Sequence, residues 1–415
     1  MNNVPSILQK IRIWGFTGIL NFIKRHVNEW MMRRVFLLNA RRHPISPTRG
    51  ITILANMTHR SSLSKVMRDL AFKFKDAGIP FQTYDLNPKS DIPDEDVMDI
   101  LTPRDQFRIL KYDHVIEMFS CPLPNGLPIR RSRVVFWEFT TGLLEFSPNI
   151  GNVDTVIAMS DFNHDVFTQL LPKTVNVKKI IYPFFFEGKN IPDKLNIRTK
   201  YKIPADAFVV FFNFDYGSSF NRKNPDGSIR AFVKAFANVN DAYLVFKTKG
   251  AARHKEERDK LVRLSGELGI TQRVIMIDDY LPQDDIYGLT GACDVYLSLH
   301  RGEGFGLGIA EAMSLGKAVI ATDYSSTTEF CLPTTSIPIP YTIVKVPKGM
   351  CDNPCYHAVK EWAEPDINAA TVALRRLYED PALRTAIGTS AKKFLEEYFS
   401  LKNFKASIES FLADS

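Results

Sequence analysis

Two glutamates enclose a run of glycines in the last third of the chain. Glu303 and Glu311 stand eight positions apart, and Gly304, Gly306 and Gly308 lie between them. The second glutamate has apolar neighbours on both sides, where an ionised carboxylate is costly unless it accepts hydrogen bonds. A ligand with vicinal hydroxyl groups, such as a ribose, would donate those bonds. The pattern therefore predicts that Glu311 holds hydroxyl groups of a ligand.

The residues around the glutamates predict a strand, a turn and a helix. Residues 294–300 predict a buried parallel strand, and residues 309–315 predict a short helix that ends at Gly316, where glycine allows a left-handed stop. The first backbone amides of a helix lack partners and its dipole is positive there, which suits an anion. We therefore expect a phosphate-bearing ligand at this turn.

A second loop supplies cations. Arg222 and Lys223 follow an expected strand at residues 207–214 and precede an expected helix at residues 225–237. Open parallel sheets bind ligands outside the carboxyl ends of their strands, so this loop is expected at the same sheet edge as the glycine turn. There, Arg222 as a planar fork and Lys223 as a point charge would neutralise a diphosphate. Taken alone, however, such a pair is more often simply solvated.

Other classes of site fit the residues less well. A dinucleotide fingerprint would need a third glycine where Leu307 or Ile309 stands, and Glu329, about 20 residues on, does not end the next strand. Two acids could serve a glycosidase, but a glycine turn suits a phosphate leaving group better. Cys351 and Cys355 have no His or Cys partner at zinc spacing, so no metal site is predicted.

Short strands and helices alternate through most of the chain. Alternation with short loops predicts doubly wound parallel sheets, and a length of 415 residues predicts two domains. The further expected strands are residues 50–55, 80–86, 113–117, 133–136, 153–158, 242–247, 273–277 and 317–322. The further expected helices are residues 63–77, 255–268, 283–289, 367–378, 381–387, 391–399 and 404–412, with another that begins after Ser160.

The positive charge of the chain is concentrated at its start. Residues 1–42 hold eight Lys or Arg and one Glu, whereas the rest is nearly neutral, which argues against a nucleic-acid binder. The uncharged run 13–23 is shorter than the roughly 20 apolar residues that span a bilayer, and no signal peptide is apparent. A basic helix on an anionic membrane surface and a helix docked on its own domain both remain open. Five cysteines fit a reducing cytoplasm.

These motifs resemble those of a known family. Residues 303–311 resemble the E-x7-E segment of the retaining glycosyltransferases of family 4, which adopt the GT-B fold. Residues 222–225 with 229–232 are similar to the phosphate-binding loop of that family, and residues 362–366 to a segment of its bacterial polysaccharide-building members. The resemblance is specific over residues 207–412 and holds only in outline before them.

The resemblance implies a role for each matching residue. Glu311 would hold the ribose, Glu303 the hydroxyls of the transferred sugar, and Lys223 with Arg222 the departing diphosphate. Glu303, Lys223 and Arg222 form the expected catalytic set. The expected donor-binding set comprises Glu311, Gly304, Phe305, Gly306 and Leu307. Members of the family need neither a metal nor a cofactor.

The chain departs from the family in its first half. Residues 56–59 replace the glycine pair that often follows the first strand, and the usual histidine is not evident around residues 119–121. His59 and Ser61 are therefore only candidates for phosphate or acceptor contacts. His300 and Arg301, just before the glycine turn, are candidates for the same contacts. A histidine packed in the core would explain His300 equally well.

Together, the residues predict an α/β protein of the GT-B fold, with two Rossmann-like doubly wound domains facing a cleft and an N-terminal helical extension. The expected segments are residues 1–45 as the extension, 46–185 as the acceptor domain, 186–204 as the linker, 205–395 as the donor domain and 396–415 as a helix crossing back to the first domain.

The predicted function is retaining transfer of a sugar from a UDP- or GDP-sugar to a glycan or lipid-linked acceptor in cell-surface polysaccharide synthesis. The alternative is a non-catalytic nucleotide-sugar-binding or scaffolding protein of the same fold. We expect a cytoplasmic protein, and binding of residues 1–42 to an anionic membrane would place it at the inner face.

Overall fold

The structure, a computed structural model, describes residues 48–59, 61–86, 99–102, 112–118, 129–184, 186, 188, 191–350 and 353–413. The predicted helical extension at residues 1–45 lies outside them. The chain divides into two compact units, Met1–Val134 with Asn152–Thr155, and Val135–Gly151 with Val156–Ser415. Each unit is described by itself below.

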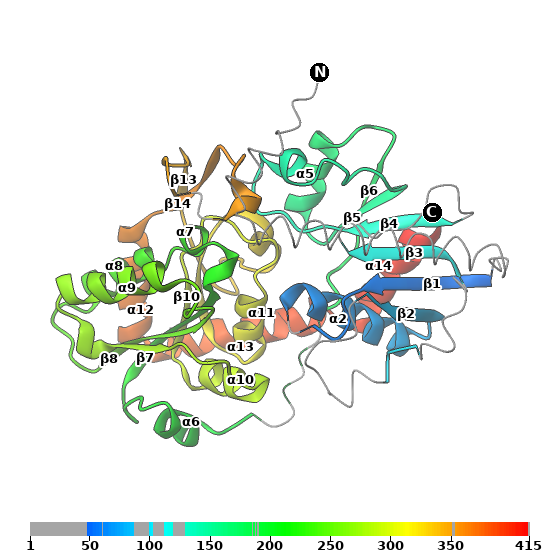
Figure 1. The fold of residues 1–415 in the computed structure, drawn as a ribbon. Helices are drawn as coiled ribbons and strands as arrows, with labels where there is room; N and C mark the ends of the chain where they lie inside the picture. Colours follow the sequence, from blue (N-terminus) through cyan, green and yellow to red (C-terminus); the bar gives the residue numbers. More distant parts are fainter. Residues whose placement is uncertain are drawn as a thin grey trace. The chain divides into compact units, whose positions relative to one another are not determined.

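Two sheets of six strands confirm the predicted α/β class (Figure 1). The strand orders are β2-β1-β3-β4-β5-β6 and β12-β11-β10-β7-β8-β9. The described pairs within these sheets are parallel. The strands of the first sheet are β1 (Thr48–Ala55), β2 (Phe81–Asp85), β3 (Tyr112–Met118), β4 (Arg130–Val134), β5 (Thr155–Ala158) and β6 (Asn176–Lys179). Those of the second are β7 (Phe208–Asp215), β8 (Ala242–Lys249), β9 (Val274–Ile277), β10 (Val295–Ser298), β11 (Ala318–Thr322) and β12 (Ile337–Ile339).

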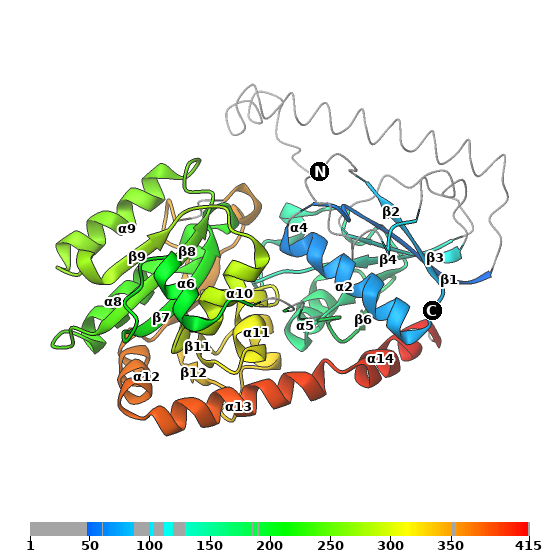
Figure 2. The same ribbon diagram turned by 90° about the horizontal axis from the view of Figure 1, so that it is seen from below.

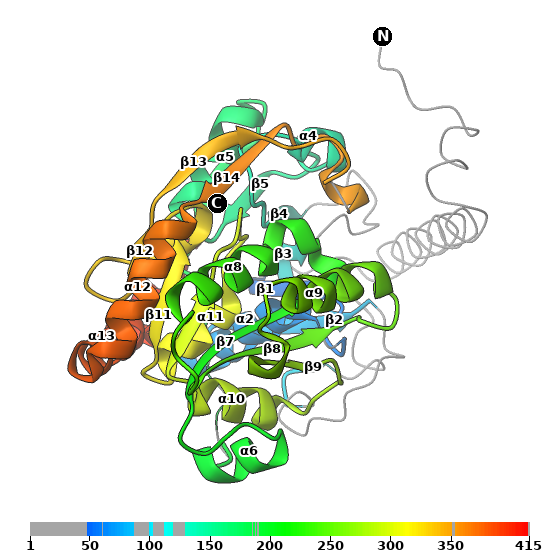
Figure 3. The ribbon, with the colours of Figure 1, turned by 90° about the vertical axis from the view of Figure 1, so that its left-hand side faces the viewer.

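Helices cover both faces of the second sheet (Figure 3). Helices α8 (Pro225–Ala235), α9 (Lys255–Glu267) and α12 (Ile367–Glu379) pack together on one face. Helices α10 (Gln283–Ala292) and α11 (Leu307–Ser314) lie on the other, where α6 (Lys194–Lys200) packs on α10 and α13 (Pro381–Tyr398) on α11. The remaining helices are α2 (Ser62–Ala77), α4 (Leu143–Phe146), α5 (Asp161–Leu170), α7 (Phe220–Lys223) and α14 (Leu401–Ala413). Short 3-10 turns are η1 (Tyr216–Ser218), η2 (Thr271–Arg273), η3 (Ser325–Glu329) and η4 (Pro354–Tyr356).

Several local features differ from the sequence expectations. Strands β6 and β12 lie in segments for which no strand was expected. Residues 381–387 and 391–399, expected as two helices, form the single helix α13, which Figure 2 shows leading into α14. Gly388 lies in the middle of α13, and a side chain there would collide with the backbone carbonyl of Gly316, so glycine allows close packing rather than a break. Helix α6 lies within the segment expected to be a linker. An antiparallel hairpin of β13 (Tyr341–Lys345) and β14 (Glu361–Pro365) was not expected at all.

Candidate active site

Strand β10, a glycine turn and helix α11 form the centre of the site. The helix begins at Leu307, two residues earlier than predicted, so its first turn starts directly after Gly306. Gly306 has a φ of 92°, and a Cβ there would lie 2.6 Å from Thr327 Cγ2, so this position requires glycine. The chain leaves the helix through Gly316, whose φ of 69° is the predicted left-handed stop. The first amides of α11 have no acceptor within the helix, as an anion site requires.

The cationic loop is tied to the turn by backbone contacts. Asn224 ends α7 with a φ of 54°, and its side chain accepts a bond from the Gly227 amide at 3.1 Å. The same side chain donates to the Leu299 carbonyl at 2.8 Å. The Arg301 amide donates to the Arg222 carbonyl at 2.8 Å. These bonds hold α7 beside the residues that follow β10, as expected for two loops at one sheet edge.

Arg222, Lys223 and Glu303 form one buried ion cluster. Lys223 Nζ donates to Glu303 Oε1, and Arg222 Nη1 lies 3.4 Å from Glu303 Oε2. Arg222 also donates to two backbone carbonyls, from Nη1 to Gly302 at 2.7 Å and from Nη2 to Ser218 at 2.8 Å. The structure therefore brings together the three residues expected to be catalytic, although here the cations are held by protein groups.

The cluster keeps the Glu303 carboxylate ionised. Burial by itself would raise the pKa of Glu303, but the charges of Lys223 and Arg222 outweigh it and lower this pKa to about 2. Burial lowers the pKa of Lys223, and the charge of Glu303 only partly offsets that effect. The charge of Glu303 thus counteracts the cost of burying the Lys223 ammonium.

A second carboxylate, Glu138, reaches the same cluster and was not identified from the sequence. Its Oε1 lies 3.8 Å from Arg222 Nη1 and accepts a hydrogen bond from the Tyr356 hydroxyl at 3.0 Å. The Asn163 side chain orients this segment by donating to the Trp137 carbonyl at 2.6 Å. The available signal was a single acidic residue within the otherwise apolar run 134–139.

Gly302 and Gly304 allow the segment of Glu138 to approach the glycine turn. A Cβ at Gly302 would lie 2.7 Å from the Glu138 carbonyl oxygen. A Cβ at Gly304 would lie 3.1 Å from the Cβ of Phe136. The first two glycines of the turn thus make room for the residues after β4, whereas Gly306 shapes the start of α11.

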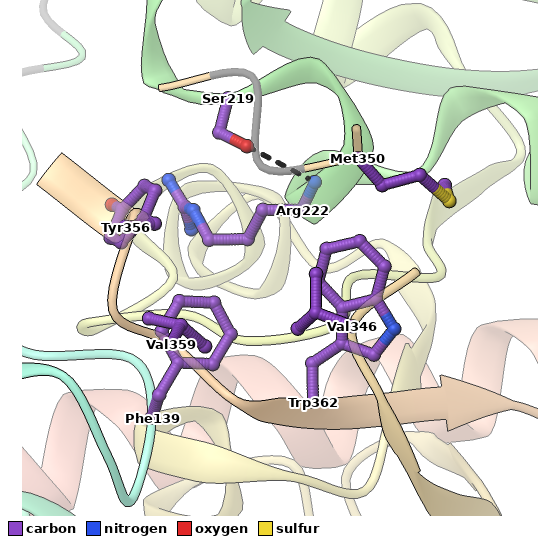
Figure 4. A pocket seen from close by; sticks show the side chains of 8 residues that line it. All are labelled: Phe139, Ser219, Arg222, Val346, Met350, Tyr356, Val359 and Trp362. Carbon is purple, nitrogen blue, oxygen red and sulfur yellow. Dashed lines mark hydrogen bonds between the residues drawn. The ribbon is translucent and has the colours of Figure 1, made fainter. Parts of the chain in front are cut away.

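The β13–β14 hairpin and the chain between its strands cover Arg222. The Tyr356 ring centroid lies 5.6 Å from Arg222 Cζ. Figure 4 shows Arg222 beside Tyr356 in a pocket. The lining residues are Phe139, Ser219, Arg222, Val346, Met350, Tyr356, Val359 and Trp362. The pocket is mostly apolar and has room for about one water molecule, so it cannot hold a nucleotide.

Arg301, a candidate acceptor or phosphate contact, holds this hairpin in the described state. It donates to both carboxylate oxygens of Glu364, from Nε at 2.6 Å and from Nη2 at 2.8 Å. Its Cζ lies 4.8 Å from the Trp362 ring centroid, and Nη1 donates to the Asn221 carbonyl at 2.6 Å. Its part in ligand binding stays a prediction.

His300 is fully buried behind the turn. Its Nδ1 lies 3.1 Å from Ser298 Oγ, and its Nε2 lies 3.3 Å from Thr327 Oγ1 and 3.4 Å from the Tyr324 carbonyl. Burial lowers the pKa of His300 to about 4, so the ring is neutral near pH 7. The ring packs β10 against η3; a ligand contact stays a prediction.

Glu311 lies on α11 with 5% of its surface exposed. Residues of β10 and β7 lie beside the first turn of α11. The Tyr296 hydroxyl donates a hydrogen bond to Asn213 Oδ1 at 2.5 Å, and both groups lie next to Gly308. A Cβ at Gly308 would lie 2.5 Å from that hydroxyl, so glycine is required there as well. The role of Glu311, and of the amides of Phe305 and Leu307, in donor binding stays a prediction.

His59 and Ser61 belong to the first unit. Ser61 caps α2, where its hydroxyl accepts from the Ser64 amide at 3.2 Å. His59 is exposed, and its carbonyl accepts from Arg68 Nη1 at 3.0 Å. Their contacts with a phosphate or an acceptor stay predictions.

None of the helices in the described part of the chain combines the length and the apolar composition that a membrane span requires. Within the same residues, no group of three or more His, Cys, Asp and Glu side chains is arranged to hold a metal ion.

Comparison with solved structures assigns the fold. The chain aligns with HepE of Anabaena, solved with UDP-glucose, at a TM-score of 0.64 and 16% identity, over 88% of this chain and 100% of that one. It aligns with sucrose-phosphate synthase of Thermosynechococcus elongatus at a TM-score of 0.61 and 16% identity, over 88% and 99% of the two chains. WaaG, a glycosyltransferase of lipopolysaccharide biosynthesis, gives a TM-score of 0.57 at 14% identity, over 86% and 98%. The predicted GT-B fold is thereby confirmed.

Similarity in sequence covers a smaller part of the chain than similarity in structure. The family model for glycosyl transferases group 1 matches residues 193–333, the stretch that holds both loops of the site. The serotype-specific mannosyltransferase WbdA of Escherichia coli is 27% identical over 139 residues. That match covers 32% of this chain and 16% of the mannosyltransferase.

Proposed function

We propose that this protein is a glycosyltransferase that moves a sugar from a nucleotide-sugar to a glycan or lipid-linked acceptor in cell-surface polysaccharide synthesis. The observation that carries the proposal is the buried cluster of Arg222, Lys223 and Glu303 beside the start of α11. A diphosphate needs cations and free amides, and a sugar needs a carboxylate, so the cluster matches both halves of such a donor. The group 1 family match over residues 193–333 supports it.

We propose that the donor binds at this cluster. Lys223 and Arg222 are occupied by Glu303 and by backbone carbonyls in the described state. A bound diphosphate would attract Lys223 toward its oxygens and leave Glu303 to accept bonds from the sugar hydroxyls. In the transition state, charge builds up on the leaving diphosphate, where these cations stabilise it.

We propose that the reaction retains the configuration of the sugar and needs no metal. The bond between the anomeric carbon and the phosphate oxygen breaks while the acceptor oxygen bonds to the same face. The acceptor proton passes to the leaving phosphate. The support is the resemblance of residues 303–311 to retaining enzymes of family 4. The anomeric configuration of the product, determined by NMR, tests retention. The rate of transfer with and without EDTA tests the metal requirement.

The donor is best identified by thermal shift with UDP-glucose, GDP-mannose, ADP-glucose and dTDP-glucose. HepE was solved with UDP-glucose and WbdA is a mannosyltransferase, so the first two are the leading candidates. A ligand at a hundred times its Kd stabilises the folded state by about 2.7 kcal/mol, which raises Tm measurably. We expect one base and sugar to stand out. No stabilisation by these four or by any other nucleotide-sugar at millimolar concentration would contradict the proposal.

The second candidate function is a non-catalytic nucleotide-sugar-binding or scaffolding protein. Such a protein would show the same thermal shift. An enzyme, however, slowly releases free nucleoside diphosphate from its donor and does so faster with an acceptor. The intact set of Arg222, Lys223 and Glu303 favours the enzyme.

We further propose that residues 1–42 bind an anionic membrane surface. The basis is their eight cations against one acidic residue. The full chain should bind vesicles that contain phosphatidylglycerol, and less so as salt rises, because salt screens the charges. Vesicles of phosphatidylcholine alone serve as the control. Unchanged binding after deletion of residues 1–42 would refute this assignment.

A further inference from the structure

Glu138 is the one carboxylate of the ion cluster to which the proposed donor site assigns no task. It comes from the segment after β4, lies 3.8 Å from the same Arg222 Nη1 that donates to the Gly302 carbonyl, and keeps 14% of its side-chain surface exposed. It is the carboxylate that the structure alone reveals.

The charges of the cluster already balance without a ligand. Arg222 and Lys223 contribute two positive charges, and Glu303 and Glu138 can contribute two negative ones. The diphosphate of a nucleotide-sugar would add about two further negative charges at the same cations. Like charges this close in a buried site disfavour one another, so the cheapest response is for one carboxylate to bind a proton.

Glu303 is poorly suited to take up that proton. In the protein without ligand it bonds to Lys223, lies near Arg222 and has a pKa lowered to about 2. With donor bound, the sugar hydroxyls would donate to it instead, and such bonds also favour the ionised carboxylate. A shift of several pKa units would be needed to protonate it near neutral pH.

Glu138 is much better suited. Arg222, at 3.8 Å, is its nearest cation, and its hydrogen bond comes from a neutral hydroxyl, that of Tyr356. Burial raises the pKa of Glu138, Arg222 opposes this shift, and the charge of Glu303 adds to it.

The groups that face Glu138 come from three elements. Helix α7 contributes Arg222 and Lys223, the glycine turn contributes Glu303, and η4 contributes Tyr356 and Cys355. Burial raises the pKa of the Tyr356 hydroxyl and of the Cys355 thiol, so both are neutral near pH 7. Of the two carboxyls in this set, Glu138 is therefore the one whose pKa is raised, whereas that of Glu303 is lowered.

We propose that Glu138 binds a proton from solvent when the diphosphate of a nucleotide-sugar occupies Arg222 and Lys223, so that donor binding and proton uptake are linked at this carboxyl. The proposal rests on the proposed function, because it needs a diphosphate at these cations. The proton adds to a carboxylate oxygen of Glu138, and no covalent bond of the donor changes.

The direction of the pH dependence follows. Bound diphosphate raises the pKa of Glu138 above its already raised value in the free protein. Between these two values, binding takes up a proton, so donor affinity falls as pH rises, by at most tenfold per pH unit for one proton. Below both values Glu138 is protonated in either state, and above both it is ionised in either state, so the dependence vanishes.

Isothermal titration calorimetry with the full chain tests this linkage. UDP-glucose and GDP-mannose are the probes, because their diphosphate esters do not titrate between about pH 5.5 and about pH 8. Titration in two buffers of different ionisation enthalpy gives the number of protons taken up. We expect uptake by the wild-type protein and an affinity that falls with pH over part of this range.

Glu138→Gln should abolish the Glu138 share of the uptake and bind the donor as well as the wild type does at low pH. Any uptake by Lys223 remains in both proteins, so the difference reports Glu138. Glu145→Gln, which removes the same charge from an exposed position of the same segment, should behave as the wild type. If Glu138→Gln fails to fold, Tyr356→Phe is the second variant. Loss of its hydrogen bond to the carboxylate should move the pH dependence to higher pH.

The outcomes separate the two proposals. Donor binding with no proton uptake, or with equal uptake in Glu138→Gln, would overturn the role of Glu138 and leave the donor site intact. A wild-type protein that binds neither probe nor any other nucleotide-sugar would overturn the proposed function, and the linkage with it.

Discussion

Replacing Lys223 with alanine is expected to lower the rate of sugar transfer by about a thousandfold or more. The ammonium lies in the buried cluster, with 16% of its side chain exposed, where its charge is weakly screened. Cations that stabilise a leaving phosphate are worth roughly 10³ to 10⁵ in rate. Because the charge on the leaving diphosphate grows in the transition state, the loss should appear mainly in kcat. Steady-state release of nucleoside diphosphate in the presence of acceptor measures it.

Lys392→Ala is the matched control for this variant. Lys392 lies exposed on α13, within the described residues, and its removal should leave both kcat and KM unchanged. Lys223→Ala should keep its far-UV circular dichroism and a cooperative melt. Full activity of Lys223→Ala would contradict the assignment of the ion cluster as the reaction centre.

Replacing Glu311 with alanine is expected to weaken donor binding by about a hundredfold or more. Hydrogen bonds to a charged group contribute about 1.5 to 3 kcal/mol each, and a ribose offers two hydroxyls to this carboxylate. Glu311 is buried on α11, and alanine is favourable in a helix, so the fold should persist. The loss should appear in KM and in the donor Kd, measured by calorimetry, because the ribose takes no part in bond breaking.

Glu267→Ala, at an exposed position at the end of α9, controls for the lost charge.

Lys223→Ala and Glu311→Ala should differ in the kinetic constant that each one changes. Lys223→Ala should bind donor measurably and turn over slowly, whereas Glu311→Ala should approach normal turnover at saturating donor. Unchanged donor affinity in Glu311→Ala would remove the ribose role that the resemblance implies.

Local sequence signals predicted most of the framework of the site. The strand at residues 294–300 appears as β10, and the cap at Ser160 accepts a bond from the Asn163 amide at 3.1 Å. Gly316 adopts the expected left-handed conformation. These features depend on side chains within a few positions of one another, so short-range pattern and turn chemistry suffice to specify them.

Predictions failed where distant parts of the chain decide the local structure. Residues 381–387 and 391–399 were expected as two helices, yet α13 runs through Gly388, where the absence of a side chain lets the helix approach Gly316. The hairpin of β13 and β14 has no tight turn between its strands, and its pairing joins Tyr341 to Pro365. Neither contact leaves a short-range signal in the sequence.

The sequence by itself determined the chemical groups of the site and the elements that carry them. Glu303 and Glu311 with their glycines, and Arg222 with Lys223, are specified by type and spacing, and parallel-sheet topology places both loops at one edge. Only the tertiary structure decided which charges pair. Lys223 bonds to Glu303, 80 residues away, and Tyr356 bonds to Glu138, 218 residues away. Such pairings depend on the packing of whole elements. A buried charge is costly unless it is paired, and the fold decides which opposite charges lie close enough to pair.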